Sequence, residues 1–207
     1  VSHALSIHRE DIKSDEKIKK IIKKSNTDFK VDIRELYTIK VKTIYGVIIN
    51  YATKAQSLLN LNDSQNNQIS EIKVANRKMV EIIRDVRELS KNVTLYLNSD
   101  NEHIQKEYNI FRKRTAKVLR VIYLFRTEED NEAYYQKLLE LKQDAKERIH
   151  KSNTRIEHLI RKDLITEDMA SSLVNDNDNV NDMIKKLITV AELLYGRKDT
   201  LLENEDK

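Results

Sequence analysis

Apolar residues recur at every third or fourth position through most of this chain. The stretch "VDIRELYTIKVKTIYGVIINYATKAQSLLNL" places them at Leu36, Ile39, Ile44, Val47, Tyr51, Ala55 and Leu58. This spacing is typical of one face of an α-helix. We therefore predict a long helix from about residue 31, with Asp32 as its N-cap. Gly46 lies inside this helix and indicates a close contact with another helix, because glycine otherwise weakens a helix interior.

The same periodicity predicts four further helices, separated by polar turns near residues 60–63, 98–102 and 126–132. The second helix runs from about 64 to 97, with a predicted buried stripe of Ile72, Ala75, Met79, Ile83, Val86, Leu89 and Val93. The third has the cleanest heptad spacing, at Ile104, Tyr108, Phe111, Thr115, Val118, Ile122 and Phe125. Helices over about 133–162 and 166–195 follow, the last with Thr166 as N-cap and Gly196 as its stop.

Composition supports an all-α fold. The 207 residues include no proline and two glycines, so the usual helix breakers are nearly absent. Charged residues make up 35% of the chain, as expected for long two-faced helices. Because the turns are short, sequential helices are predicted to pack antiparallel in one helical bundle.

Charge and residue usage exclude several classes of protein. The chain has no cysteine, so neither a disulfide framework nor a thiolate metal site can form. Its 38 basic and 34 acidic residues give a net charge of +4, too balanced for a dedicated nucleic-acid binder. No apolar run reaches the ~18 residues that a membrane span requires. The sequence starts at Val1 rather than methionine, which favours a fragment of a longer protein.

Three regions differ in character. Residues 1–30 form a predicted connector in which lysines surround Ile18, Ile21 and Ile22, at spacings compatible with a short basic amphipathic helix. This segment is either a solvated connector or a contact to an anionic membrane surface. Residues 31–196 form the predicted bundle, and residues 197–207 are predicted to be a frayed tail.

Two acidic pairs occur at a spacing of four residues. "VEIIRDV" contains Glu81 and Asp85, and "NDNVNDM" contains Asp178 and Asp182. Residues four apart share a helix face, and both pairs are predicted to lie opposite the apolar stripes of their helices. Carboxylate oxygens suit hard divalent or trivalent metal ions, so the four residues are candidate metal ligands, with a solvated acidic face as the alternative. Because the pairs occupy corresponding helices, 97 residues apart, we interpret the two halves as structural repeats.

The run "VNDNDNVND" (174–182) resembles the acidic helix of the PhoU family of phosphate regulators, and "VEIIRDV" occupies the corresponding place in the first half. Further stretches are similar to the PhoU-like cytoplasmic region at the end of bacterial sodium/phosphate cotransporters. These are "SHALSIHREDI" (2–12), "ELYTIKVKTIYGVIINYATKAQSLL" (35–59), "KVANRKMVEIIRDV" (73–86), "EYNIFRKRTAKVLRVI" (107–122) and "DLITEDMASSLVND" (163–176).

This resemblance implies two three-helix repeats, each with a Glu/Asp-x-x-x-Asp metal motif, to which Glu81, Asp85, Asp178 and Asp182 correspond. It also implies a non-catalytic regulatory or interaction domain at the cytoplasmic face of the inner membrane. Its candidate partners are the transporter's own membrane domain, a second copy of the chain and an anionic membrane surface, with no nucleic acid expected. Only five long helices are predicted here, so the first helix of the first repeat is lost or replaced by the connector, and Met183 stands where the family often has histidine.

Three features of the sequence bear on other interpretations. A free-standing helical scaffold or coiled-coil interaction protein would show the same periodicity. A carboxylate-bridged metal enzyme would need inward Glu-x-x-His motifs, whereas "EHLI" (157–160) has the histidine adjacent to the glutamate. "FRKRTAKVLR" (111–120) collects five basic residues on one helix face, which could meet phosphate or lipid headgroups but is interpreted as a solvated basic face.

Overall fold

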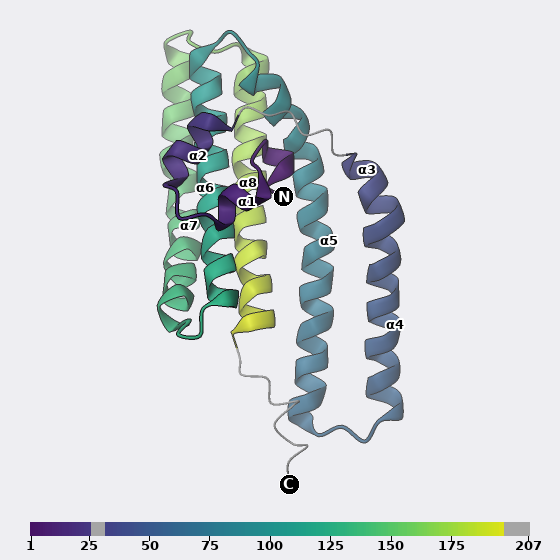
Figure 1. The fold of residues 1–207 in the computed structure, drawn as a ribbon. Coiled ribbons are helices and arrows are strands. Elements are labelled where there is room, and N and C mark those ends of the chain that lie inside the picture. Colours follow the sequence, from purple (N-terminus) through teal and green to yellow (C-terminus); the bar gives the residue numbers. More distant parts are fainter. Residues whose placement is uncertain (26–31, 197–207) are drawn as a thin grey trace.

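The computed structural model describes residues 1–25 and 32–196, and every regular element in these two ranges is helical. Five long helices follow one another between short turns (Figure 1): α4 (Lys42–Leu58), α5 (Asp63–Leu97), α6 (Glu102–Thr127), α7 (Glu132–Arg161) and α8 (Glu167–Tyr195). The predicted all-α class is thereby confirmed, and the predicted bounds of α5, α7 and α8 agree to within one residue. The predicted tail over 197–207 lies outside the described residues.

The chain before α4 is divided into short elements: η1 (His3–Leu5), α1 (Arg9–Lys13), α2 (Ile18–Lys24), α3 (Ile33–Glu35) and η2 (Leu36–Val41). η1 is a 3-10 turn and η2 is a stretch of π-helix that joins α3 to α4. The single helix predicted from about residue 31 is therefore present, continuous from residue 33 to residue 58, with a π-helical stretch in its first part. Its start is capped as predicted, since the backbone N–H of Glu35 donates to the Asp32 side chain at 2.9 Å.

Side-chain caps fix where the later helices begin. At the start of α5 the backbone N–H of Gln65 donates to the Asn62 side chain at 2.9 Å, and the Asn62 N–H donates to the Gln65 side chain at 3.0 Å. This reciprocal pair is a capping box. Asn101 caps α6 by accepting from the Ile104 N–H, and its own amide donates to the Leu164 carbonyl at 2.8 Å. The turn before α6 is thus tied to the turn before α8.

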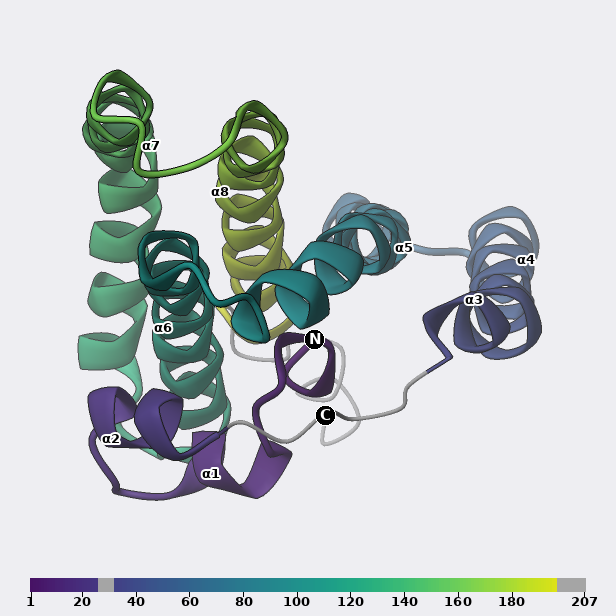
Figure 2. The same cartoon turned by 90° about the horizontal axis from the view of Figure 1, so that it is seen from above.

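α6, α7 and α8 form a three-helix bundle, and α5 packs along α8. The two helices run in opposite directions, because Tyr96 lies 3.0 Å from Ser172 between the hydroxyl oxygens, whereas Asp85 pairs with Lys186. Figures 1 and 2 show α4 on the outer side of α5, away from α6, α7 and α8. The molecule is therefore a three-helix bundle extended by a helical hairpin of α4 and α5.

The heptad stripe predicted for α6 is confirmed as the centre of the core. Ile104, Tyr108, Phe111 and Thr115 have no measurable exposure, and Val118 and Phe125 are each 2% exposed. Ile122 is half-buried against the same cluster. Because the stripe alternates steps of three and four residues, one face of α6 packs against its neighbours along the whole helix.

The N-terminal segment is packed rather than solvated. Leu5, Ile7 and Ile21 are at most 1% exposed, and α1 and α2 lie against α6. The interpretation of this segment as a solvated connector is therefore wrong for its described part. The alternative membrane contact would have used the isoleucine face of α2, but Ile21 and Ile22 are buried within the protein.

Two arginines of α6 hold this segment in place through its backbone carbonyls. Arg112, which is 1% exposed, donates to the carbonyls of Leu5 at 2.7 Å and Ser6 at 2.8 Å. Arg120 donates to the carbonyls of Ile12 at 3.0 Å and Glu16 at 2.6 Å. The prediction of one solvated basic face on this helix is therefore wrong, because these guanidinium groups replace water at carbonyls that would otherwise be buried unpaired.

Candidate functional site

The first predicted acidic pair lies on α5 beside α8. The Asp85 side chain is 18% exposed, and it accepts a hydrogen bond from the Lys186 ammonium of α8 at 2.7 Å. Glu81, one turn earlier, lies 4.0 Å from the Nε of Arg77 on the same helix. The expectation that both carboxylates point away from the packed helices is wrong for Asp85, which joins two of them.

The second predicted pair, Asp178 and Asp182, is exposed on α8, as the helical pattern predicted. Asp182 accepts from the Lys185 ammonium at 3.4 Å. Within residues 1–25 and 32–196, no group of three or more His, Asp or Glu side chains is arranged to hold a metal ion. Each pair would thus offer a metal ion two carboxylates at most from this part of the chain. The assignment of these four residues as metal ligands stays a prediction.

A buried carboxylate that sequence reasoning did not single out lies between the two halves of the chain. Asp176 of α8 is 2% exposed; its Oδ2 accepts from the Tyr108 hydroxyl at 2.7 Å and from the Asn92 amide at 2.9 Å. Burial raises the pKa of the Asp176 carboxyl, while the hydrogen bonds from Tyr108 and Asn92 oppose that change. Helices α5, α6 and α8 therefore meet at one polar centre.

Two asparagines continue this polar centre along α8. Asn181 donates to the Asn177 carbonyl at 2.7 Å, and the Asn177 amide lies 3.4 Å from the Asn153 side-chain oxygen on α7. Both asparagines of α8 have no measurable exposure. They follow Leu173 by four and eight residues and so occupy positions of the apolar stripe. Asparagine at stripe positions was the sequence signal for this buried network.

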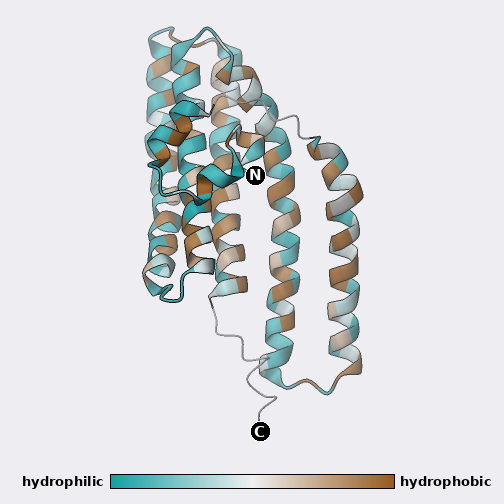
Figure 3. Ribbon diagram, in the orientation of Figure 1, coloured by the Kyte–Doolittle hydropathy of each residue, from teal (hydrophilic) through white to brown (hydrophobic). Residues whose placement is uncertain are grey.

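Apart from Leu95 of α5, the large apolar side chains of the described residues that are more than half exposed lie in η2, in α4 or directly after it. They are between 57% and 79% exposed and comprise Ile39, Ile44, Val47, Tyr51, Leu58 and Leu59. We call these six residues the α4 face. Figure 3 shows hydrophobic residues along the length of α4, although this helix lies at the edge of the molecule. Of the residues of α4, only Ala52 is buried in the described structure.

The α4 face is also free of acidic residues. Between residues 36 and 62 the chain contains three lysines and no aspartate or glutamate. The other side of α4 faces α5, where the Asn76 amide lies 3.4 Å from the Tyr45 carbonyl and the Lys73 ammonium donates to Gln56 at 2.5 Å. The close helix contact expected at Gly46 is not made within the described residues, since a Cβ placed there would meet nothing within 4 Å.

The apolar surface extends onto the beginning of α5. Ile72 and Met79, predicted as part of the buried stripe, are each 38% exposed, whereas Val86, Leu89 and Val93 are buried. Figure 1 shows that α5 begins beyond the end of α8. Ala75, between Ile72 and Met79, is fully buried, so the stripe is only partly covered near the start of α5. The pattern predicted the face correctly but not the extent of its burial.

Comparisons of the chain with protein-family models, with curated proteins and with solved structures find no match. None of the helices in residues 1–25 and 32–196 combines the length and apolarity needed to cross a bilayer. Family membership is therefore not shown. The resemblance of the sequence stretches and the surfaces just described are the observations that bear on function.

Proposed function

We propose that this chain is a non-catalytic regulatory domain of a sodium-dependent phosphate transporter, placed at the cytoplasmic face of the inner membrane. We further propose that the α4 face contacts the transporter's own membrane domain. The link to phosphate transport is supported by the sequence resemblance alone. The docking role is supported by one structural observation, the exposed and acid-free apolar face of α4.

The energetics favour a partner on this face. Burying one aliphatic side chain is worth about 1.5–3 kcal/mol, and six large apolar side chains of the α4 face lie in water instead. Contiguous apolar patches on soluble proteins commonly mark interaction sites. A partner that buries this face would therefore gain hydrophobic free energy that folding of the domain alone does not provide.

The charge of the segment around α4 indicates which kind of partner covers the α4 face. Lysines are enriched where proteins meet the cytoplasmic side of a membrane, whose surface is anionic. The 36–62 segment has lysines and no acidic residue, so the membrane surface would attract it and nothing in the segment would be repelled. The apolar stripe between the lysines would then pack against the ends of the transporter's membrane helices.

The repeat interpretation agrees with this role. α4 and α5 supply two helices, whereas α6, α7 and α8 supply three. A PhoU-like repeat of three helices would require one more helix against the α4–α5 hairpin. We propose that the membrane domain supplies that helix.

The test uses the full-length transporter in cells that lack other phosphate uptake. Tyr51 is 77% exposed and Leu58 is 79% exposed, so replacing each by glutamate leaves the core intact. We expect Tyr51→Glu with Leu58→Glu to change sodium-dependent phosphate uptake, or its response to external phosphate, at least threefold. The reason is that burying an unpaired carboxylate costs free energy and so weakens the contact with the membrane domain.

The matched control is Thr53→Glu with Ser57→Glu, which introduces the same two charges on an exposed part of α4 away from the stripe. It should leave uptake within experimental error, and immunoblots should show equal amounts of all variants. Deletion of residues 1–207 that leaves both uptake and its regulation unchanged would rule out the proposed function.

A free-standing helical scaffold is the second candidate, and one observation favours it. Ile44, Val47, Tyr51 and Leu58 are spaced by three, four and seven residues, as in helices that pack as coiled coils. In that case two copies would pair through the α4 face. Light scattering on the purified chain would then show a dimer that Tyr51→Glu dissociates, with no effect of this variant on phosphate uptake.

A further inference from the structure

A cavity of about 390 Å³ opens between α6 and α7, at a distance from the α4 face. Its polar lining consists of five basic side chains and one carboxylate, from Lys113, Arg114, Lys117, Asp144, Arg148 and Arg155. Apolar side chains of α6, α7 and α8 form the rest of the wall. The cavity is therefore cationic and partly apolar, although the chain as a whole is almost neutral.

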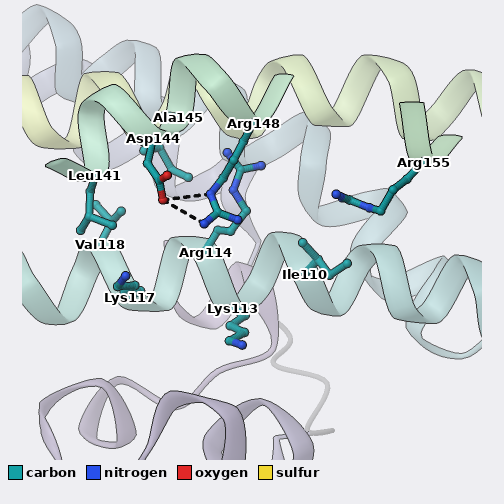
Figure 4. Close-up of a pocket in the computed structure, with 11 residues that line it drawn as sticks. Ile110, Lys113, Arg114, Lys117, Val118, Leu141, Asp144, Ala145, Arg148 and Arg155 are labelled. Carbon is teal, nitrogen blue, oxygen red and sulfur yellow. Dashed lines mark hydrogen bonds and ion pairs between the residues drawn. The ribbon is translucent and has the colours of Figure 1, made fainter. Parts of the chain in front are cut away.

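Carboxylates neutralise only part of this charge. Asp144 pairs with Arg148 at 2.9 Å, and Glu107, which is buried, pairs with Arg155 at 3.0 Å. Lys113, Arg114 and Lys117 form no ion pair with another described residue. Arg114 and Lys117 thus add unpaired positive charge to a cavity whose lining contains one carboxylate, while the Lys113 side chain points to the other side of α6 (Figure 4).

Arg114 is held at the back of the cavity. Its guanidinium donates to the side-chain oxygen of the fully buried Asn181, which orients it from α8. Figure 4 shows Arg114 and Arg148 in the space between α6 and α7, with Arg155 reaching in from further along α7. Burial, and after it the charges of Arg148 and Arg155, lower the pKa of Arg114 to about 10. Arg114 therefore stays protonated at neutral pH although it is repelled by the two neighbouring arginines. A bound anion would offset this repulsion.

The type of anion follows from the groups present. Planar guanidinium groups match the oxygens of a phosphoryl group, and lysine adds compact positive charge. Small-molecule sites typically have volumes of about 300–1,000 Å³ and combine apolar walls with a few polar anchors. We propose that this cavity binds an organic phosphate, with its phosphoryl group between Arg114, Arg148 and Lys117 and its less polar part against the apolar wall.

This site does not depend on the proposed transporter function, because it involves neither the α4 face nor the PhoU resemblance. The purified chain can be titrated calorimetrically with ATP and, separately, with inorganic phosphate at 50 mM and 300 mM NaCl. We expect one ATP to bind per chain, at least tenfold more tightly than inorganic phosphate, which leaves the apolar wall unused. Affinity should fall at the higher salt concentration, since charge pairing contributes to binding.

Variants locate the binding to the cavity. Arg148→Gln combined with Lys117→Gln removes two exposed cations of the lining and should weaken ATP binding at least tenfold. The matched control is Arg161→Gln combined with Lys151→Gln, which removes two exposed cations from α7 outside the cavity. Arg161 pairs with Glu157 four residues away, as Arg148 does with Asp144. The control should change the affinity less than twofold.

A third variant separates geometry from charge. Arg114→Lys keeps the positive charge but loses the guanidinium fork, so binding should weaken at unchanged net charge and with a melting temperature close to that of the wild type. Vesicles with phosphatidic acid distinguish a lipid headgroup from a soluble organic phosphate as the source of the phosphoryl group. The proposal is overturned if neither ATP nor the vesicles bind, or if the two double variants weaken binding equally.

Discussion

Asp176 places a carboxylate in the middle of the fold, where it accepts hydrogen bonds from Tyr108 and Asn92. Its pKa lies above the ordinary value of 3.8, because burial penalises the charged form more than the two hydrogen bonds favour it. The folded state therefore binds this proton more tightly than the unfolded state does. The contribution of Asp176 to stability must then decrease as the pH rises from about 3.8 through the raised pKa.

The variant Asp176→Asn tests the sign of this effect. Asparagine keeps an acceptor for the Tyr108 hydroxyl but carries no charge that burial could penalise. We expect the free energy of unfolding of the variant, relative to the wild type, to be greater at pH 7 than at pH 4.5, as measured by urea denaturation. A difference that is constant with pH, or that grows as the pH falls, would contradict the assignment.

The variant Asp176→Ala tests the hydrogen bonds rather than the charge. It leaves the Tyr108 hydroxyl and the Asn92 amide without this acceptor. An unpaired buried group such as the Tyr108 hydroxyl costs about 1–3 kcal/mol, whereas Asn92 is only half-buried. The protein should therefore be destabilised at pH 7, as measured by urea denaturation. A matched control is Asp178→Ala, at the exposed position two residues later, which should change stability by no more than about 0.5 kcal/mol.

At the scale of single elements, α4 combines an apolar sequence with little burial, and Gly46 is its weakest point. A methyl group at this position meets no atom within 4 Å, and the backbone is helical. Gly46→Ala should therefore stabilise the chain by about 0.5–1 kcal/mol, because alanine loses less conformational entropy on folding. Chemical denaturation measures this. A destabilising result would mean that another helix packs closely against Gly46, as predicted from the sequence.

Periodicity predicted the five long helices and most of their ends, because apolar spacing and polar caps are local properties of the sequence. It also predicted the stripe of α6 that forms the core. It could not predict which stripes are covered, since a pattern defines an apolar face but not its partner. α4 shows this difference: its stripe is also spaced mostly by three or four residues, but much of it lies in solvent, whereas that of α6 is buried.

The candidate sites were predictable to a smaller degree. Exposure of Asp178 and Asp182 followed from the helical pattern, but the position of Asp85 did not. α5 is flanked by α4 on one side and α8 on another, so a residue opposite the apolar stripe can still contact a neighbour. The cavity between α6 and α7 combines residues from distant parts of the chain, and no local motif predicts such a combination.

At the scale of the whole molecule, the N-terminal segment is joined to the bundle by its buried apolar side chains and by the arginines of α6. Arg120 is half-buried and donates to three carbonyls of the segment, those of Asp11, Ile12 and Glu16. Arg120→Gln should therefore increase hydrogen exchange at the amides of residues 1–25 at least tenfold, while α7 and α8 keep their protection. Lys106→Gln, at an exposed position of α6, is the control and should change neither. Equal loss of protection throughout would show that the segment and the bundle unfold together.

α5 begins beside α4, outside the bundle, and ends beside α8, within it. About 30 Å of continuous helix separates Ile72 from Asn92, and a helix of this length behaves as a stiff rod. A tilt imposed on the exposed end would move the opposite end without any loop having to rearrange. Asn92 donates to Asp176 there, so one continuous helix connects the exposed hairpin to the buried carboxylate.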